Sequence, residues 1–369
     1  MEWRGVGGEV TLAEQPAIET APEAAAVGAA LQQYLDDRSA DLRVLECERV
    51  SGGYETFIYS VRLEGAGALL PAGPKLIVRI YRGVNVVERC GWEAAAIAAM
   101  RERGIPTPPL HLHEPDPAPL GAPFLVLGFL PGRRMDEAAL AGGTVAVVKL
   151  LKAYAEMQTR IHAIDWPEGR ELLRSLQTDT TFDALAWAPG RLRAARTELE
   201  SRSLTALLPV VDWLERNRRL LKGAPEVFVH GDFHPLNIFV EGTRISGILD
   251  WGSCGFATRY EDIGWSSALI ATVSAVDKKE DRQLAPYRTV AHKIYLGLLW
   301  KAGGLNRGAL RWGEVYGALR WLLIFLPSYL PNAGPAVLNP DAATLTTPLY
   351  VKRVRRFIEK RTKLTLEIA

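Results

Sequence analysis

A short stretch of the chain, Val229–Phe239, places polar side chains between apolar ones. Its sequence, VHGDFHPLNIF, has Asp232 just after an apolar run and Asn237 five residues later. Another apolar run ends at Asp250, which is followed by Trp-Gly. Polar groups in apolar surroundings are costly unless they have a partner or a use. Aspartate and asparagine oxygens are ligands that suit Mg²⁺, and a carboxylate is also a general base.

Short strand patterns around this stretch predict that the three side chains meet. VFVH, NIFV and ISGILD are typical of short strands within residues 227–250, and the last two flank the turn E-G-T. A hairpin returns the chain to its start, so we expect Asp250 beside Asn237. Asp232, Asn237 and Asp250 would then converge on one site. The alternative is that each is only a turn residue or a helix cap.

The rest of the sequence separates into a β-rich part and a mostly helical part. Ala21–Asp37 and Cys90–Gly104 are predicted helices, and residues 105–123 form a Pro-rich loop. Strand patterns lie at VLECERV, YETFIYSVRLEG, KLIVRIY and FLVLG. From about residue 138 onward helical patterns dominate, apart from the strands within 227–250. We expect a ligand cleft where the two parts meet.

The composition is that of an ordinary globular protein, with 48% hydrophobic residues, 23% charged residues and a net charge of +2. This balance gives no reason to expect a nucleic-acid partner. The three cysteines are far apart and are expected to be reduced thiols in a cytoplasmic protein. No signal peptide is expected, and Trp321–Leu330 is expected to be a buried helix rather than a membrane span. Val351–Lys363 is expected to be an amphipathic helix with a solvated basic face.

The ordered set of H-G-D-x-x-x-x-N, a hairpin and D-W-G resembles the aminoglycoside phosphotransferase and choline kinase family of protein-kinase-like small-molecule kinases. The resemblance implies an α+β, bilobal protein-kinase-like fold with a small β-rich N-lobe and a larger, mainly helical C-lobe. It also divides the chain. Residues 1–20 would be a disordered arm, 21–130 the N-lobe with the nucleotide-binding sheet and hinge, and 131–369 the C-lobe with the catalytic loop and acceptor pocket.

The resemblance also assigns roles to individual residues. Asp232 would be the catalytic base, and Asn237 and Asp250 would hold Mg²⁺. Arg79, oriented by Glu93, would hold the α and β phosphates at a position where the family has lysine or arginine. The other nucleotide contacts would come from a flexible turn over the phosphates and from the adenine side of the cleft: Ser51, Gly52, Gly53, Ile77, Leu127 and Phe129.

Simpler interpretations exist for several of these residues. Taken alone, Arg79 could be a surface charge on an edge strand, and Glu93 could lie on a solvated helix face. Asp262 matches an acidic position that would brace the catalytic loop, although it could also be a plain N-cap. His230 and His234 lack metal-ligand partners and are expected to order the loop.

The function that the resemblance implies is ATP- and Mg²⁺-dependent transfer of the γ-phosphate to a hydroxyl of a small molecule, such as an antibiotic, a sugar or another metabolite. Residues 251–369 hold nine Asp and Glu against seventeen Lys and Arg, which favours a neutral or anionic acceptor over a polycationic aminoglycoside. The alternatives are a choline or hydroxyacyl-type kinase, a protein kinase and an inactive nucleotide-binding scaffold. The sequence leaves the oligomeric state and the choice between ATP and GTP open.

Overall fold

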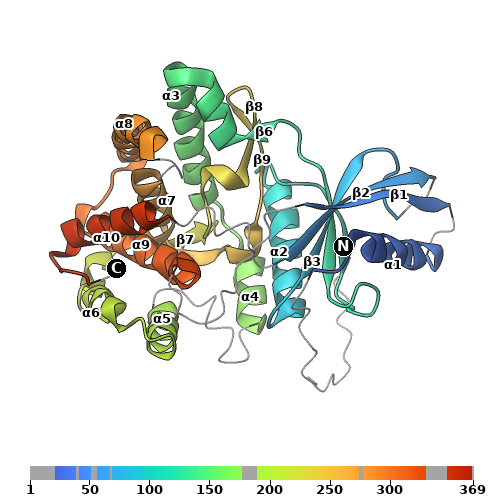
Figure 1. The fold of residues 1–369 in the computed structure, drawn as a ribbon, viewed down its shortest axis with the longest axis horizontal. Helices are drawn as coiled ribbons and strands as arrows, with labels where there is room; N and C mark the ends of the chain where they lie inside the picture. The colour runs from blue at the N-terminus through green and yellow to red at the C-terminus, as the bar shows by residue number, and fades with distance from the viewer. Residues whose placement is uncertain are drawn as a thin grey trace.

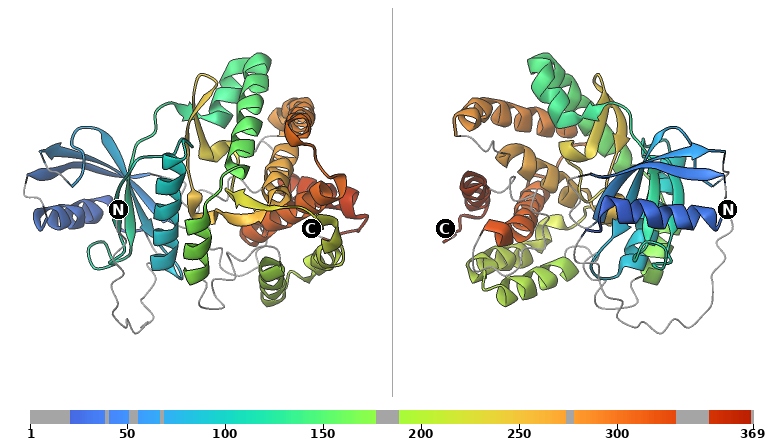
Figure 2. Two further views of the ribbon diagram at one scale, coloured as in Figure 1. Left: turned by 180° about the vertical axis from the view of Figure 1, so that it is seen from behind. Right: turned by 45° about the vertical axis from the view of Figure 1, so that its right-hand side comes forward.

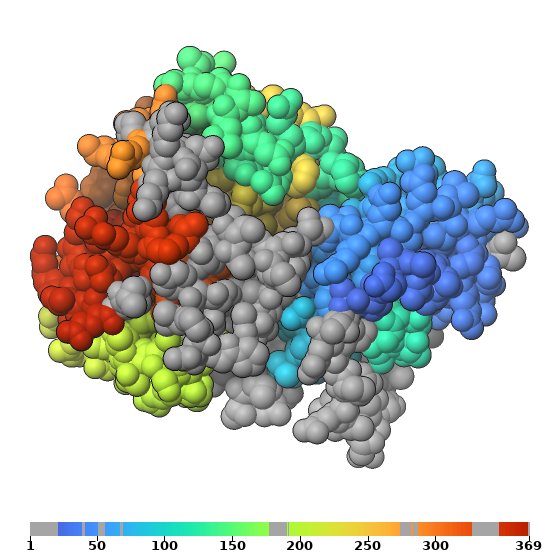
Figure 3. All heavy atoms as spheres, in the orientation of Figure 1, coloured from blue at the N-terminus to red at the C-terminus, as the bar shows by residue number. Residues whose placement is uncertain are grey.

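The computed structural model describes residues 21–38, 41–50, 56–66, 69–176, 189–273, 278–329 and 347–367. These residues form a small β-rich lobe beside a larger, mainly helical lobe (Figure 1). The small lobe protrudes to one side of the molecule in the space-filling view of Figure 3. The predicted α+β, bilobal fold is therefore confirmed. The predicted arm at 1–20 and the predicted turn at Ser51, Gly52 and Gly53 lie outside the described residues.

The small lobe is built on one antiparallel sheet with the strand order β1-β2-β3-β5-β4. Its elements are α1 (Ala24–Asp36), β1 (Leu42–Val50), β2 (Thr56–Gly65), β3 (Lys75–Tyr81), α2 (Val86–Glu102), β4 (Leu110–Glu114) and β5 (Phe124–Gly128). The sequence does not predict β4, because its segment is rich in proline. Helix α2 begins earlier than the predicted Cys90, directly after Asn85 in a left-handed conformation.

The two faces of the sheet have different partners, because side chains alternate along each strand. One face packs against α1 and includes Leu76, Val78 and Ile80 of β3. The opposite face of β3 carries Ile77, Arg79 and Tyr81, and Arg79 is ion-paired with Glu93 of α2. Since β3 is the middle strand of five, Arg79 does not lie on a sheet edge.

The large lobe consists of helices around a group of short strands. Its helices are α3 (Met135–His162), α4 (Pro167–Leu176), α5 (Pro189–Ser201), α6 (Leu208–Arg216), α7 (Arg259–Thr272), α8 (Lys278–Gly303), α9 (Arg307–Tyr329) and α10 (Pro348–Thr362). Its strands are β6 (Arg133–Arg134), β7 (Glu226–Val229), β8 (Ile238–Glu241), β9 (Arg244–Ile248) and β10 (Gly255–Thr258). Single 3₁₀ turns are η2 (Thr205–Leu207), η3 (Arg218–Leu221), η4 (Pro235–Asn237) and η5 (Trp251–Ser253).

The short strands lie between α2 of the small lobe and the helices of the large lobe, as Figure 2 shows from behind. Strands β8 and β9 form the predicted hairpin, and β6 pairs with β8. Strand β10, which the sequence does not predict, pairs with β7. The polar cluster therefore lies where the lobes meet.

Helix α3 is the one helix, among the residues described, that is long and apolar enough to cross a membrane by length and composition. Its second half packs in the core through Leu150, Tyr154 and Ile161. The helix is interrupted at Gly143, whose φ of 67° and ψ of −173° are not helical. The expected absence of a membrane span and the cytoplasmic location both stay predictions.

The apolar and basic segments near the C-terminus form packed helices. Trp321, Leu322 and Leu326 of α9 are buried, as expected for the described part of Trp321–Leu330. In α10, the buried apolar face is formed by Val351, Val354, Phe357 and Ile358. Both segments belong to one core cluster, so the predicted buried helix and amphipathic helix are confirmed.

A buried carboxylate on α9 fixes the C-terminal helix to this lobe. Glu314 accepts hydrogen bonds from Arg361 of α10 through Nε (2.6 Å) and a terminal nitrogen (2.8 Å). It also accepts one from the Ser267 hydroxyl of α7 at 2.6 Å, and His292 Nε2 of α8 lies 3.4 Å away. Burial alone would raise the pKa of Glu314, but His292 and Arg361 lower it to about 2.

Glu314→Gln should remove an acid-sensitive contribution to stability. Because the folded-state pKa is depressed from 4.5 to about 2, the contribution is complete above pH 4.5 and is lost as the pH falls through this interval. Chemical denaturation at pH 7 and pH 3 measures this contribution to the free energy of unfolding. The difference in unfolding free energy between wild type and variant should shrink at pH 3 by on the order of 2 kcal/mol. An equal difference at both pH values would contradict this assignment.

Candidate active site

The β8–β9 hairpin brings Asn237 and Asp250 together. Ile238 and Ile248 are register partners, and the backbone N–H of Leu249 donates to the Asn237 carbonyl oxygen at 2.8 Å. Asp250 follows in a left-handed conformation with φ 63° and ψ 65°, and its side chain is 44% exposed. Non-glycine residues with such backbone angles are strained and cluster at functional sites.

Asp232 lies between β7 and η4, and its carboxylate faces Asn237 and His234. Asn237 Nδ2 donates to Asp232 Oδ2 at 2.9 Å and to the Asp232 carbonyl oxygen at 3.1 Å. His234 Nε2 lies 3.3 Å from the same carboxylate oxygen. Burial alone would raise the pKa of Asp232, but His234, then Arg320 and His230, hold it well below its ordinary value. Asp232 is therefore ionised, and its side chain is 23% exposed.

Gly231 fixes the turn that presents Asp232. Its φ is +80°, and a Cβ at this position would lie 2.0 Å from the Ser253 carbonyl oxygen, so only glycine fits. Asp262 Oδ1 of α7 accepts a hydrogen bond from the Gly231 N–H at 2.9 Å. A terminal nitrogen of Arg320 on α9 donates to the Gly231 carbonyl oxygen at 2.8 Å. Two helices of the large lobe thus hold the same glycine.

His230 connects the catalytic loop to the hairpin. Its Nδ1 accepts from the Asp232 N–H at 3.2 Å, and its Nε2 donates to the Leu249 carbonyl oxygen at 3.0 Å. Burial lowers the pKa of His230, in agreement with this neutral tautomer. These contacts suit the expected loop-ordering role.

Asp262 is a buried brace with several partners. Besides the Gly231 N–H, its carboxylate contacts His162 Nε2 at 2.9 Å and Gln158 Nε2 at 3.0 Å. Burial alone would raise the pKa of Asp262, but His162 lowers it. The N-cap of α7 is Thr258, so Asp262 is not a plain cap. The sequence indicates the acidic position but not its histidine partner.

Arg79 joins the two lobes. One terminal nitrogen of its guanidinium lies 2.7 Å from Glu93 Oε1, and the other lies 3.2 Å from Asp250 Oδ1. Arg79 is 9% exposed and Glu93 is 1% exposed, so neither is a solvated surface residue. Burial alone would lower the pKa of Arg79, but Glu93 and then Asp250 raise it. The Tyr81 hydroxyl donates to Glu93 Oε2.

The residues expected on the adenine side lie on β3 and around the end of β5. Ile77 and Leu127 are register partners, and Ile77 is two residues from Arg79, on the same face of β3. Leu127 is buried, whereas Phe129 is 54% exposed and lies near Lys75, whose Nζ is 6.0 Å from the ring centroid. The structure brings Ile77 and Leu127 together, and adenine binding there stays a prediction.

Asn237 and Asp250 have the chemistry that an Mg²⁺ ion needs when it takes its other ligands from phosphates and water. Because the Asn237 nitrogen is bonded to Asp232, its amide oxygen remains as the acceptor atom. Asp250 presents an accessible carboxylate. Within the described parts of the chain, no group of three or more His, Cys, Asp or Glu could hold a metal by itself. Two protein ligands therefore suit a metal that arrives with a nucleotide.

Sequence reasoning missed four side chains around this site. The carbonyl oxygen of Phe233, next to Asp232, accepts hydrogen bonds at 2.7 Å from the hydroxyls of Tyr154 and Ser266. Arg320 and Tyr81 are the other two. Only Tyr81 has a local signal, because it lies two residues after Arg79 and therefore on the same face of β3.

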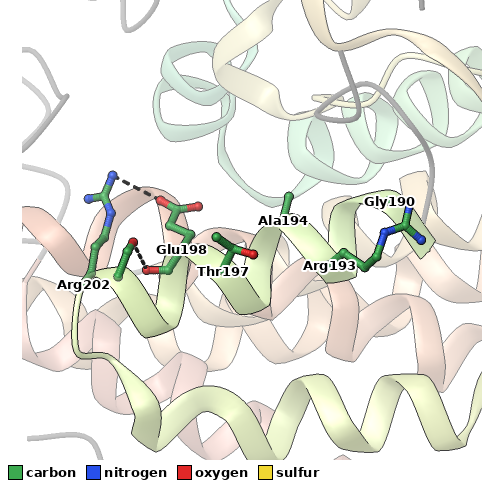
Figure 4. A pocket seen from close by; sticks show the side chains of 7 residues that line it. Gly190, Arg193, Ala194, Thr197, Glu198 and Arg202 are labelled. Atoms are coloured by element: carbon green, nitrogen blue, oxygen red, sulfur yellow. Dashed lines mark hydrogen bonds and ion pairs between the residues drawn. The ribbon is translucent and has the colours of Figure 1, made fainter. Parts of the chain in front are cut away.

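A separate surface hollow lies along α5, away from these residues. It is lined by Gly190, Arg193, Ala194, Thr197, Glu198, Ser201 and Arg202 (Figure 4). Glu198 and Arg202 form an ion pair of 3.2 Å along the helix. None of the candidate site residues lines this hollow, and we assign no role to it.

A β-rich lobe and a helical lobe meet at a bridging arginine, with Asp232, Asn237 and Asp250 at the junction, and this is the arrangement of a kinase-like phosphotransferase. Comparison with known families identifies the group. The model of the phosphotransferase enzyme family matches residues 46–292, and the chain belongs to this family. The chain is therefore a phosphotransferase enzyme.

Solved structures with low sequence identity share the fold. A candidate aminoglycoside phosphotransferase from Ralstonia eutropha has a TM-score of 0.57 and 14% identity, over 91% of this chain and 97% of that chain. APH(2″)-IIa in complex with streptomycin and ATP has a TM-score of 0.53 and 13% identity, over 82% of this chain and 92% of that chain. An aminoglycoside 3'-phosphotransferase of Niallia circulans is 46% identical over 37 residues, which span 10% of this chain and 14% of that protein.

Proposed function

We propose that the protein transfers the γ-phosphate of ATP to a hydroxyl group of a small molecule in an Mg²⁺-dependent reaction. The observation that carries the proposal is the position of buried Arg79, which pairs with Glu93 of the small lobe and Asp250 of the large lobe. Asp232 of the large lobe accepts a hydrogen bond from Asn237, and its neighbours lower its pKa. The complex of APH(2″)-IIa with ATP supports the choice of nucleotide.

In this proposal residues 21–130 bind the nucleotide and residues 131–369 carry the catalytic loop and the acceptor pocket. Arg79, oriented by Glu93, holds the α and β phosphates. Nucleotide contacts are also assigned to Ser51, Gly52, Gly53, Ile77, Leu127 and Phe129. Asn237 and Asp250 hold Mg²⁺, which when bound neutralises charge on the β and γ phosphates.

Asp232 acts on the acceptor. It orients the hydroxyl and accepts its proton while the acceptor oxygen forms a bond to the γ-phosphorus and the bond from that phosphorus to the ADP oxygen breaks. Phosphoryl transfer depends mainly on positioning and charge neutralisation, so the proton moves late. The neutral His230 holds the Asp232 backbone and leaves the carboxylate as the proton acceptor.

The acceptor is inferred to be neutral or anionic. Residues 251–369 hold seventeen Lys and Arg against nine Asp and Glu, and the Arg320 guanidinium lies at the catalytic loop, 2.8 Å from the Gly231 carbonyl oxygen. A polycationic aminoglycoside or choline would meet repulsion there, whereas a sugar, a macrolide or a hydroxyacyl compound would not. A protein substrate is less well supported, because β10 and α7 follow Asp250 within a few residues and leave no room for an activation loop. An inactive scaffold is less well supported too, because every catalytic position of the motif is filled, by Asp232, Asn237 and Asp250.

Mass spectrometry after incubation with Mg·ATP tests this proposal. The panel contains aminoglycosides, macrolides, simple sugars, choline and hydroxyacyl thioesters. We expect phosphate on a neutral or anionic member. Phosphate on aminoglycosides alone would keep the reaction but contradict the inferred acceptor class. No product, together with no binding of Mg·ATP, would refute the proposed function.

Arg79→Lys is expected to raise the Kd for Mg·ATP about tenfold, because an ammonium group cannot reproduce the two-armed contact of the guanidinium. Isothermal titration calorimetry measures the change. Arg82→Lys, just beyond β3, is the matched control and should bind like wild type. An unchanged Kd for Arg79→Lys would show that the fork geometry is not used.

A further inference from the structure

Helices α7 and α9 cross at very short range. Gly313 and Gly317 of α9 face Gly264 of α7. A Cβ on Gly264 would lie 2.0 Å from the backbone carbonyl carbon of Gly313, and one on Gly317 would lie 2.7 Å from the Trp265 backbone. These contacts leave no room for a side chain, so the three glycines set the distance between the two helices.

Arg320, which lies about one turn beyond Gly317, reaches from this crossing to the catalytic loop. Its guanidinium carbon lies 4.5 Å from the centroid of the Trp265 ring, and a terminal nitrogen donates to the Gly231 carbonyl oxygen at 2.8 Å. Trp265 is buried. Stacking on a fixed aromatic face restricts the orientation of a planar guanidinium. Helix α7 therefore holds the arginine that α9 supplies.

Asp262 and Arg320 act on opposite ends of one residue. Asp262 accepts from the N–H of Gly231, and Arg320 donates to its carbonyl oxygen, which belongs to the peptide that leads into Asp232. Gly231 has a φ of +80° and the freedom of a glycine, so this turn needs external support. A shift of about 1 Å in a reacting group can cost on the order of 100-fold in rate.

We propose that Arg320 is a positioning residue for phosphoryl transfer, which holds the Gly231 carbonyl so that Asp232 points at the acceptor hydroxyl. This inference rests on the proposed function. Arg320 donates to the loop backbone, and its positive charge also acts on the Asp232 carboxylate. Both effects fall on the catalytic loop rather than on the Arg79–Glu93 pair that would hold the phosphates. Removal of Arg320 should therefore act on kcat and leave nucleotide binding unchanged.

Arg311 on the same helix provides a matched control. Its guanidinium also lies over a tryptophan, 5.2 Å from the centroid of Trp213, and it also donates to a backbone carbonyl, that of Arg361. These partners lie on α6 and α10, and neither belongs to the catalytic loop. A loss of a generic arginine contact would affect Arg311→Gln and Arg320→Gln alike.

Arg320→Gln should lower kcat about 10- to 100-fold without a change in the KM for ATP. Arg320→Lys keeps a charged donor and should recover part of the lost kcat. Hydrogen–deuterium exchange at Gly231 and Asp232 should be faster in Arg320→Gln than in wild type. Arg311→Gln should match wild type in both measurements. Thermal unfolding and Mg·ATP titration verify that each variant is folded. If Arg320→Gln does not fold, kcat and hydrogen–deuterium exchange are compared between Arg320→Lys and wild type instead.

Each outcome either supports or overturns the positioning role of Arg320. If wild type neither phosphorylates an acceptor nor binds Mg·ATP, the proposed function fails, and exchange at Gly231 and Asp232 still shows whether Arg320 holds the loop. Unchanged exchange in Arg320→Gln would overturn the inference. So would faster exchange with an unchanged kcat, because Arg320 would then be only structural. A change confined to the KM for ATP, or one shared by Arg311→Gln, would overturn it as well.

Discussion

Asp232→Asn is expected to lower kcat for phosphoryl transfer by about 10³-fold and to leave the Kd of Mg·ATP unchanged. Asparagine keeps the size of the side chain but cannot accept the proton of the acceptor hydroxyl. The wild-type carboxylate is held in its ionised form by His234, Arg320 and His230, so it is ready to act as a base near neutral pH. Steady-state kinetics and calorimetric titration with Mg·ATP measure the two quantities.

Asp116→Asn is the control for this experiment. Asp116 lies in the loop between β4 and β5, where its carboxylate accepts a hydrogen bond from the Ala118 N–H at 2.9 Å. This variant should keep the kcat of wild type. Near-full turnover by Asp232→Asn would remove Asp232 from the role of base, and a loss of Mg·ATP affinity would assign it to the nucleotide site instead.

Asp262→Ala is expected to lower the free energy of unfolding by about 3–5 kcal/mol. The buried carboxylate accepts from the Gly231 N–H and contacts His162 and Gln158. Its removal takes this acceptor away from the Gly231 N–H and from His162, and an unpaired buried polar group costs more than the bond itself contributes. Urea denaturation of wild type and variant measures the difference.

A surface carboxylate provides the comparison. Asp212 is ion-paired with Arg196 at 2.7 Å, but its side chain is 50% exposed. Asp212→Ala should therefore lower the free energy of unfolding by less than about 1 kcal/mol. If the two variants lost similar amounts, Asp262 would not be the brace of the catalytic loop.

The core of the candidate site could be predicted because its geometry is local. A two-strand hairpin necessarily returns the chain to its start, so Asn237 and Asp250 meet. Alternation along β3 likewise places Ile77 and Arg79 on one face of the sheet. The order of strands and helices follows from periodicity, which predicts the β-rich and helical lobes.

The contacts that hold the loop could not be predicted, because they come from distant parts of the chain. Arg320 lies 89 residues from Gly231, and Tyr154 lies 79 residues from Phe233. No spacing rule connects residues so far apart. Strand β4 escapes prediction for another reason: it is an edge strand, and edges tolerate the neighbouring prolines.

Titration of the protein with ATP, with and without Mg²⁺, tests the central claim most directly, because it needs no knowledge of the acceptor. We predict saturable binding of ATP that depends on Mg²⁺. Asp250→Asn should weaken this binding strongly, and Asp212→Asn should leave it unchanged. If no nucleotide binds, or if Asp250→Asn binds as tightly as wild type with the same Mg²⁺ dependence, the assignment of Asn237 and Asp250 to an Mg-nucleotide site is wrong.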